Sequence, residues 1–271
     1  MKFIKWIVPA VALITLSGCS ATFITKPEAS NIKKVAIVSI WGSKSIDNPN
    51  GGYGAALTQV SSLTGIKNDV DFQKIYGKTY QEFSRALKDN AGIEVIPESA
   101  ALNSPAGKSL SEAAAKAFKA MGMLIETDAL EEVYRPGAKV YGPQLVRCLT
   151  GCDEYEKDMK KAFSDYSKAT GVDGVIVLNP KLSFYQSGAA SFVTGGLAGD
   201  ASASLMVSIY MFDKNGTPAQ YTEIPGVYES QQPVTQVAGG IALTKETEAA
   251  YISIIPAGMD EFAKQMKSGI K

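Results

Sequence analysis

The sequence of 271 residues contains no histidine. This absence excludes serine–histidine–aspartate triads, cysteine–histidine pairs and histidine-ligated zinc, and it removes the side chain used most often for acid–base catalysis. Paired carboxylates, or a lysine acting with a serine, remain open as catalytic groups. We therefore expect a protein that is not an enzyme and that has no catalytic residue, no cofactor and no metal.

The sequence also lacks an excess of charge and a long apolar segment. Lysine and arginine together number 27, as do aspartate and glutamate. A nucleic-acid-binding protein normally shows a basic patch or a high isoelectric point, so we expect no nucleic-acid partner. Residues 6–16 are mostly apolar, but a bilayer span needs about 20 apolar residues, and Pro9 interrupts this run. A permanent transmembrane helix is therefore not expected.

What the amino terminus does contain is the pattern of an export signal. Lys2 and Lys5 give a positive start, residues 6–16 form the apolar part, and the small residues Ser17 and Gly18 follow. We expect residues 1–18 to be removed as a signal peptide. The remaining 253 residues carry 25 basic and 27 acidic side chains and suffice for one domain with a sizeable core.

Leu16-Ser17-Gly18-Cys19 resembles the bacterial lipoprotein signal. The resemblance implies cleavage before Cys19 and attachment of diacylglycerol and palmitate to that residue. Ser20 follows the cysteine, which in Gram-negative lipoproteins implies delivery to the outer membrane. Several acyl chains hold a protein stably, whereas one holds it only marginally. The resemblance thus predicts a protein anchored in the outer membrane through Cys19, with its domain in the periplasm.

The other two cysteines, Cys148 and Cys152, have three residues between them in RCLTGCDEY. With Cys19 acylated they form an even pair in an oxidising compartment, which favours a structural disulfide. A redox-active bond and free thiols remain open. A thioredoxin-like site is disfavoured because it has two intervening residues, and a metal site would need further cysteine or histidine ligands.

The rest of the chain predicts an α/β domain, with a mixed sheet and helices packed on it. Residues 19–32 read as a lipidated polar tether and residues 33–271 as a single compact domain. Apolar runs and alternation predict strands at 35–41, 93–97, 174–184, 201–212 and 218–229. Helical spacing predicts helices at 72–92, 109–122, 153–171 and 244–268. Residues 123–147 read as a surface excursion.

Several residues predict how these elements begin, end or break. Asp71 is suited to cap the helix that starts at Phe72, and Ser109 with Glu112 has the spacing of a capping box. Pro180 should break or bulge its strand, and Pro256 should kink or divide the last helix. These expectations concern local structure alone.

Short motifs that suggest chemistry have ordinary explanations. Gly77-Lys78-Thr79 and Gly107-Lys108-Ser109 lack the earlier glycine of a phosphate-binding loop, because Phe72 and Leu102 occupy that position. The carboxylates in 126–132 and 153–156 could act as a hydrolytic pair on the cell wall. A solvated helix face explains such acidic runs better, so a hydrolase is only the second alternative function.

The glycine-rich segment 187–204 has two interpretations. It could form a long hairpin able to enter a membrane, for which strands of about 9–11 residues suffice. It could also be a loop between two strands of the sheet. Residues 183–194 alternate poorly between polar and apolar side chains, which favours the loop.

The order of these pieces resembles a group of envelope lipoproteins. KKVAIVSI, IEVIP, ATGVDGVIVL and SLMVSIYMFDKNG, with the helices between and after them, look like the curli secretion channel lipoproteins. The same arrangement occurs in the TolB amino-terminal domain and in penicillin-binding-protein activator lipoproteins. The resemblance implies a scaffold that binds other envelope proteins and that sometimes assembles into rings.

The combined expectation is a lipid-anchored periplasmic lipoprotein that acts as a binding or assembly factor for cell-envelope machinery. Its partners would be the membrane, through Cys19, and other envelope proteins, with homo-oligomers possible. We expect the segments 42–71 and 123–152 to contact partners. The first alternative is an oligomeric subunit of an outer-membrane secretion pore, for which a membrane-spanning strand pair at 183–212 would be decisive.

Overall fold

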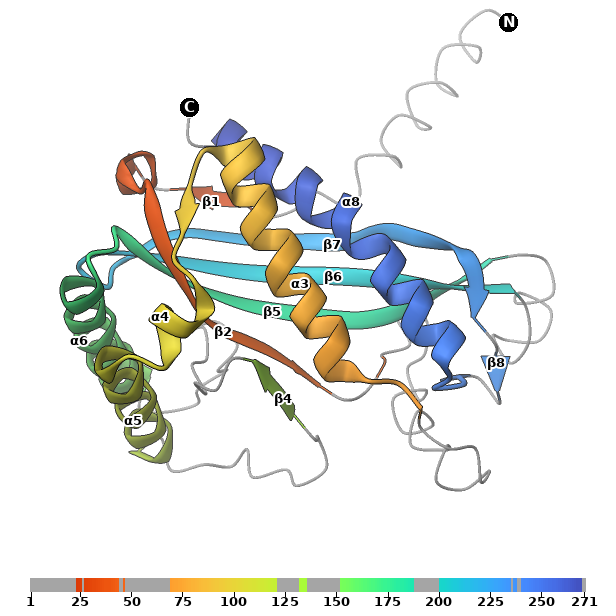
Figure 1. The fold of residues 1–271 in the computed structure, drawn as a ribbon, viewed down its shortest axis with the longest axis horizontal. Coiled ribbons are helices and arrows are strands. Elements are labelled where there is room, and N and C mark those ends of the chain that lie inside the picture. Colours follow the sequence, from red (N-terminus) through yellow and green to blue (C-terminus); the bar gives the residue numbers. More distant parts are fainter. Residues whose placement is uncertain are drawn as a thin grey trace, which may run out of the picture.

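A computed structural model describes nine stretches of the chain. They are residues 23–25, 27–43, 46, 69–120, 132–135, 152–187, 200–234, 236–237 and 240–269. Within them, one mixed sheet carries helices on both of its faces (Figure 1). The predicted α/β fold, with a mixed sheet and helices packed on it, is confirmed.

The main sheet has seven described strands. Six of them follow one another in the order β1-β7-β6-β5-β2-β3, and the seventh, β4, pairs with the end of β2 that β3 leaves free. The strands are β1 (Phe23–Thr25), β2 (Lys34–Ser43), β3 (Glu94–Val95), β4 (Glu132–Arg135), β5 (Gly174–Ser187), β6 (Asp200–Asp213) and β7 (Pro218–Val234). β8 (Gln236–Val237) and β9 (Gly240–Ile241) form a separate pair. β2 runs parallel to β3 and β5, whereas the other pairs are antiparallel.

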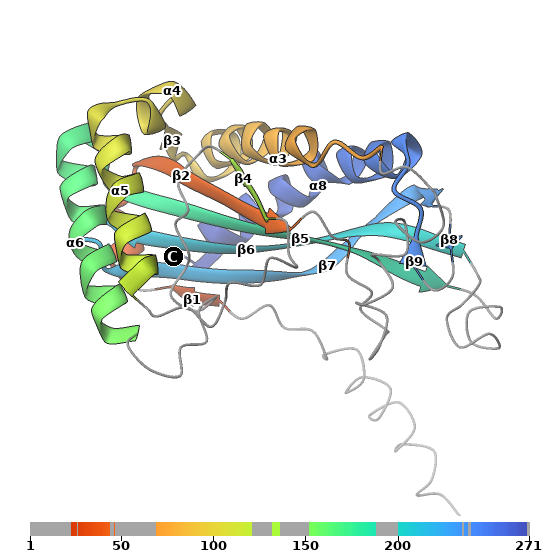
Figure 2. The ribbon, with the colours of Figure 1, turned by 90° about the horizontal axis from the view of Figure 1, so that it is seen from below.

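The helices divide between the two faces of the sheet. They are α3 (Phe72–Ala86), α4 (Glu98–Leu102), α5 (Pro105–Ala120), α6 (Cys152–Thr170) and α8 (Lys245–Gly269), with the short turns η2 (Pro27–Asn31) and η5 (Leu87–Ala91). Side by side, α3 and α8 cover one face along its length, while α5 and α6 pack at one end of the other face (Figure 2). Each helix pair therefore closes its own apolar core.

β6 shows how one strand supplies both cores. Its residues Ala201, Ala203, Leu205, Val207, Ile209 and Met211 all belong to the core beneath α3 and α8. Tyr210 and Phe212 point to the other face, where the Phe212 ring lies 4.5 Å from that of Phe163 of α6. Side chains on a strand alternate between faces, so the predicted alternation of this segment is confirmed.

The helix beginning at Phe72 is capped as predicted. The Asp71 carboxylate accepts a hydrogen bond of 3.1 Å from the backbone N–H of Lys74, which satisfies one of the otherwise unpaired donors of the first turn. α3 continues through one π-helical turn, η5, and Gly92 ends it with φ 69°. Gly171 ends α6 in the same left-handed conformation, φ 66°, which glycine adopts without a steric penalty.

The predicted start of the next helix at Ser109 is wrong. α5 begins at Pro105, and Ser104 Oγ accepts from the Gly107 N–H at 3.1 Å. Proline suits the first helical position because its missing N–H would be unpaired there anyway. This serine and proline, one turn earlier, outweigh the capping-box spacing. The short α4 that precedes α5 was not predicted.

Neither internal proline interrupts its element. Pro180 pairs with Val207 without a register shift, and the pairing of β5 with β2 has already ended at Leu178. The missing N–H of Pro180 therefore breaks no bond to β2. α8 likewise runs as one helix through Pro256. The predicted break at Pro180 is wrong, and so is the division of the last helix.

The segment expected to be a free tether, 19–32, joins the domain over most of its length. β1 pairs antiparallel with β7, Phe23 opposite Thr222 and Thr25 opposite Gln220. Ala29 and Ile32 are buried in the core beneath α3 and α8. Residues 19–22 lie outside the described residues. The polar composition of this segment had concealed these two apolar contacts.

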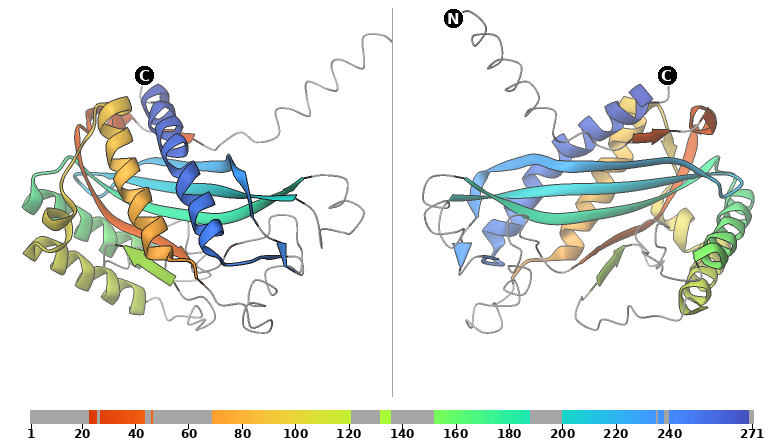
Figure 3. Two further views of the ribbon diagram at one scale, coloured as in Figure 1. Left: turned by 45° about the vertical axis from the view of Figure 1, so that its right-hand side comes forward. Right: turned by 180° about the vertical axis from the view of Figure 1, so that it is seen from behind.

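The hairpin of β5 and β6 is longer than the sequence indicated. Fourteen pairs join the two strands, from Gly174 opposite Asp213 to Ser187 opposite Asp200. The strands predicted at 174–184 and 201–212 are confirmed, and they extend through residues 185–187 and 200 into the segment for which a loop was favoured. Residues 188–199 lie outside the described residues. Buried residues such as Phe184 and Ala203 pack in the domain core, which explains why the weak alternation still yields strand. The views in Figure 3 show the three long strands side by side.

The excursion predicted at 123–147 contributes a strand. Four of its residues form β4, which pairs with the end of β2 from Ile40 opposite Arg135 to Ser43 opposite Glu132. The other residues of the excursion lie outside the described part of the chain, as do most residues of the segment 42–71.

Candidate functional site

Most of the residues predicted to carry function lie outside the described residues. Cys19 and Cys148 belong to this undescribed part of the chain. Cys152 is the first residue of α6, but its side chain is not described. The lipid anchor and the disulfide therefore remain predictions. The acidic residues of 126–131 are also outside, and those of 153–156 lie in the first turns of α6, where their side chains are not described.

Both glycine–lysine motifs lie inside helices, as their failed spacing indicated. Gly77-Lys78-Thr79 belongs to α3, where Thr79 is buried and donates to the carbonyl of Ile75 at 3.0 Å. Gly107 lies in the first turn of α5, and a Cβ there would come within 2.5 Å of the Leu102 carbonyl oxygen. This glycine serves the close packing of α5 against α4 and offers no phosphate-binding loop.

A buried carboxylate joins the beginnings of α3 and α8. Glu248 is 3% exposed, and its two oxygens accept hydrogen bonds from Lys74 Nζ at 2.7 Å, Lys245 Nζ at 2.9 Å and the Asp71 backbone N–H at 2.8 Å. The neighbouring backbone is also paired, because the Asp69 N–H donates to the Leu243 carbonyl at 2.8 Å. We call Asp71, Lys74, Lys245 and Glu248 the buried clamp.

The partners of Glu248 control its ionisation. Burial by itself opposes the charged form, but the hydrogen bonds from Lys74, Lys245 and the Asp71 N–H outweigh this effect and lower the pKa of Glu248 to about 2. The carboxylate is therefore charged at any ordinary pH. Its role is to hold two helices together, and its lone pairs are already occupied.

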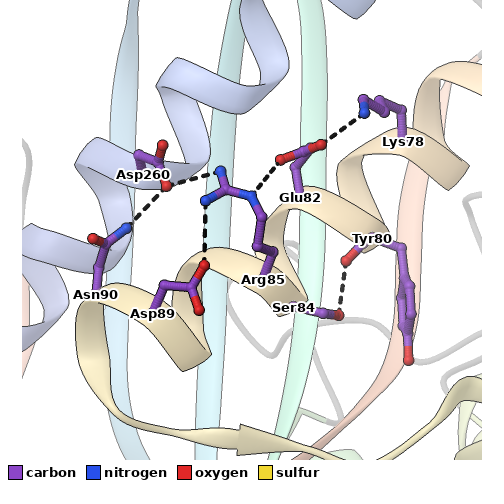
Figure 4. Close-up of polar contacts among 8 residues, drawn as sticks. All are labelled: Lys78, Tyr80, Glu82, Ser84, Arg85, Asp89, Asn90 and Asp260. Carbon is purple, nitrogen blue, oxygen red and sulfur yellow. Dashed lines mark hydrogen bonds and ion pairs between the residues drawn. The ribbon is translucent and has the colours of Figure 1, made fainter.

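A second, more exposed network joins α3 and η5 to the later part of α8 (Figure 4). Arg85 contacts Glu82 at 2.8 Å, Asp260 at 2.9 Å and Asp89 at 3.6 Å, and Asn90 Nδ2 also donates to Asp260 at 2.9 Å. Arg85 is 42% exposed. We call these five residues the exposed clamp.

Ordinary ion pairing explains the altered pKa values in this network. Hydrogen bonds from Lys78 and Arg85 lower the pKa of Glu82, and the same bond from Arg85 raises the pKa of the guanidinium, with Asp260 adding to it. Nearby, burial raises the pKa of Tyr80 to about 12. No sequence motif marked either clamp, because its partners are up to 177 positions apart.

Among the described residues, an open cleft lies between α4 and α5. It has a volume of about 750 Å³ and is lined by Glu98, Ser99, Leu102, Asn103, Lys108, Ser111 and Glu112. Two carboxylates, one ammonium group, two hydroxyls and an amide thus surround a single apolar side chain. Such a lining suits hydrogen bonding to a polar peptide or sugar better than burial of an apolar molecule.

The cleft contains both kinds of catalytic group that remain possible without histidine, namely a lysine with a serine and a pair of carboxylates. Lys108 and Ser111 are three residues apart on α5 and share one face of the helix. In the described part of the chain, the Lys108 ammonium and the Ser111 hydroxyl are not hydrogen-bonded to each other. Glu98 and Glu112 do line the same cleft. These two acids are the pair that a carboxylate mechanism would use.

Two further searches concern only the described residues. No group of three or more cysteine or acidic side chains among them could hold a metal ion. No helix in those stretches is both long enough and apolar enough to cross a membrane.

Comparison with known proteins adds no relative: neither a protein-family model nor a curated protein sequence matches this chain. The resemblance to the curli secretion channel lipoproteins therefore stays a prediction.

Proposed function

We propose that the protein is a lipoprotein, anchored through Cys19 to the outer membrane, whose periplasmic domain binds and helps to assemble other envelope proteins. The observation that supports a binding role is that the charged side chains with altered pKa values form structural ion pairs. Glu248, Glu82 and Arg85 have altered pKa values, a property that often marks catalytic groups. All three instead pair α3 with α8 or stabilise α3, which supports a rigid scaffold.

The cleft between α4 and α5 supplies a surface for a partner. It is formed by α4 and α5, which follow one another in the chain, and the lining residues Ser99, Asn103 and Lys108 are exposed. An anchor restricts such a surface to a plane and raises its effective concentration near partners in the same membrane. A polar segment of an envelope protein would thus find the cleft without a large apolar interface.

The first experiment tests the anchor and the cleft separately. Mass spectrometry of the amino-terminal peptide should show an acylated Cys19, and Cys19→Ala should release the protein from membranes. A photo-crosslinking residue at position 99 should then give one discrete adduct in cells, whereas the same residue at Gln73, on the exposed face of α3, should give none. An unmodified Cys19 would overturn the anchor, and equal labelling at 73 and 99 would overturn the cleft.

An oligomeric pore subunit remains the first alternative, and the outer edge of β7 favours it. Among the described residues, β1 pairs with β7 only as far as Thr222, although β7 runs on to Val234. A strand edge that extends beyond its neighbour can pair with another copy. The native mass of the acylated protein in mild detergent, with Cys19→Ala as control, decides: a closed ring supports the pore, and a monomer or dimer supports the scaffold.

A hydrolase acting through Glu98 and Glu112 is the second alternative, because both acids line one cleft. Each would be indispensable if one donates the proton and the other activates water or attacks the substrate. Glu98→Gln and Glu112→Gln should then each abolish release of fragments from purified cell wall. A wild-type protein that releases none would exclude this alternative.

A further inference from the structure

The pairing of β1 with β7 fixes how close the domain lies to its lipid anchor. β1 begins at Phe23, so only three residues, Ser20 to Thr22, separate the acylated cysteine from the sheet. An extended chain spans at most about 3.6 Å per residue, or roughly 14 Å over the four residue steps from Cys19 to Phe23. A domain held this closely touches or nearly touches the lipid surface, whereas the expected tether to residue 32 would have allowed about three times that reach.

The direction of β1 identifies the side of the domain that faces the lipid. β1 runs antiparallel to β7, with Phe23 opposite Thr222, so the chain before Phe23 leaves β1 beside the outer edge of β7. That edge is the one at which no further described strand lies after β1. The anchor therefore emerges from the β1–β7 edge of the sheet.

The strand order places the opposite edge away from the lipid. β3 ends the path that β1 begins, five strand spacings away, and strands lie about 4.8 Å apart, so the two edges are about 24 Å apart. β4 joins β2 next to β3.

We propose that the domain stands on the lipid surface on its β1–β7 edge and presents its β2–β3–β4 edge to the periplasm. The interaction partner of the first edge is a phospholipid surface, and that of the second is the partner protein. This orientation rests on the proposed lipid anchor at Cys19. It assigns the two edges different tasks, which the anchor alone does not.

Fluorescence energy transfer to a lipid-headgroup acceptor tests the orientation. The acylated protein is reconstituted in phosphatidylethanolamine–phosphatidylglycerol vesicles with one dye-bearing residue, placed either at Lys267 or at Glu94. Lys267 is exposed in the last turn of α8, whose carboxyl end lies beside β1 (Figures 1 and 3). Glu94 is exposed in β3, with its side chain 68% accessible. Transfer should be higher from position 267 than from position 94.

A matched variant separates orientation from mere attachment. Twelve glycine and serine residues inserted between Ser20 and Ala21 keep the anchor but lengthen the free chain about fourfold, so the difference in transfer between the two positions should disappear. Equal transfer from the two positions without the insertion, or higher transfer from 94, would overturn the orientation although the protein is bound. An unmodified Cys19 and loss of vesicle binding would instead overturn the anchor and, with it, the orientation.

Discussion

The two clamps join the same pair of helices, yet they differ in how much they should contribute to stability. The buried clamp shields Glu248 almost completely, at 3% exposure, and uses both carboxylate oxygens. The exposed clamp leaves Arg85 at 42% and Asp260 at 34% exposure. Surface ion pairs contribute only about 0–1 kcal/mol because water and salt screen them, whereas breaking a buried pair costs about 3–5 kcal/mol.

The difference shows that the number of ion pairs is a poor guide to which end of the helix pair is firmly held. Because α3 and α8 run parallel, Asp71 and Lys74 meet Glu248 at their beginnings, and Arg85 meets Asp260 about three turns later. Apolar packing accompanies the exposed clamp, where the rings of Phe83 and Phe262 lie 5.3 Å apart. The following changes test this ranking of packing, buried clamp and exposed clamp.

The largest effect is expected from the apolar packing beside the exposed clamp. Phe262 is fully buried, and Phe262→Ala should lower the free energy of unfolding by about 3–5 kcal/mol, since it removes apolar contact and leaves a cavity. Denaturant titration followed by circular dichroism measures the change. Lys264→Ala, at an exposed position two residues away, is the control and should change stability by less than about 0.5 kcal/mol.

Glu248→Gln should have the next largest effect, a loss of about 2–3 kcal/mol. The loss is smaller than for a fully buried pair because Lys74 and Lys245 are 61% and 64% exposed and can turn to water. Glu82→Gln, on the same helix pair but at a carboxylate 14% exposed, is the matched comparison and should cost about 1 kcal/mol or less. Both values come from denaturant titration at neutral pH. An equal loss in the two variants would contradict the distinction between buried and exposed clamps.

Acid should weaken the buried clamp selectively. The pKa of Glu248 is lowered to about 2 from its usual value near 4.5. A lowered folded-state pKa gives stability that is present above the unfolded-state value and that is lost as the pH falls from about 4.5 toward 2. Wild-type stability should therefore fall more steeply with acid than that of Glu248→Gln across this range. Parallel slopes for the two proteins would show that another carboxylate is responsible.

The smallest effect is expected at the exposed clamp. Arg85→Gln removes three ion pairs at once but should cost only about 0.5–1 kcal/mol in low salt. The difference from wild type should shrink further in 1 M sodium chloride, where screening acts over about 3 Å. Thermal unfolding at two salt concentrations measures this. A loss as large as that of Glu248→Gln would place the main link at this end.

Local sequence patterns predicted much of this fold. Alternation in 201–212 identified β6 and its two faces, and helical spacing with Asp71 identified α3 and its cap. In each case the deciding physics lies within a few neighbouring residues: a two-residue or 3.6-residue period, or a hydrogen bond across three positions. Signals that extend over only three or four positions can be recognised in a single sequence.

The missed features depend on distant partners. β1 forms a strand by pairing with β7, which lies about 200 positions later. β4 forms a strand by pairing with the end of β2. Pro180 is tolerated only because β2 has left β5 at Leu178. Both clamps likewise bring together side chains that are far apart in the sequence and share no motif. The cleft is formed within residues 98–112, but its shape depends on how α4 packs against α5, which residue spacing alone does not predict. The proposed anchor at Cys19 is, by contrast, a local signal.

The strand order has a consequence for how the chain folds. β5, β6 and β7 follow one another in the sequence and form a meander whose contacts need only short loops to close. β2 and β1, from the first 45 residues, must join its two outer edges last, since each pairs across well over 100 positions. Such late, long-range closure slows folding. Under the proposed export and lipidation, the amino-terminal segment would stay unpaired, with Cys19 accessible to acylation, until the carboxyl-terminal strands have been delivered.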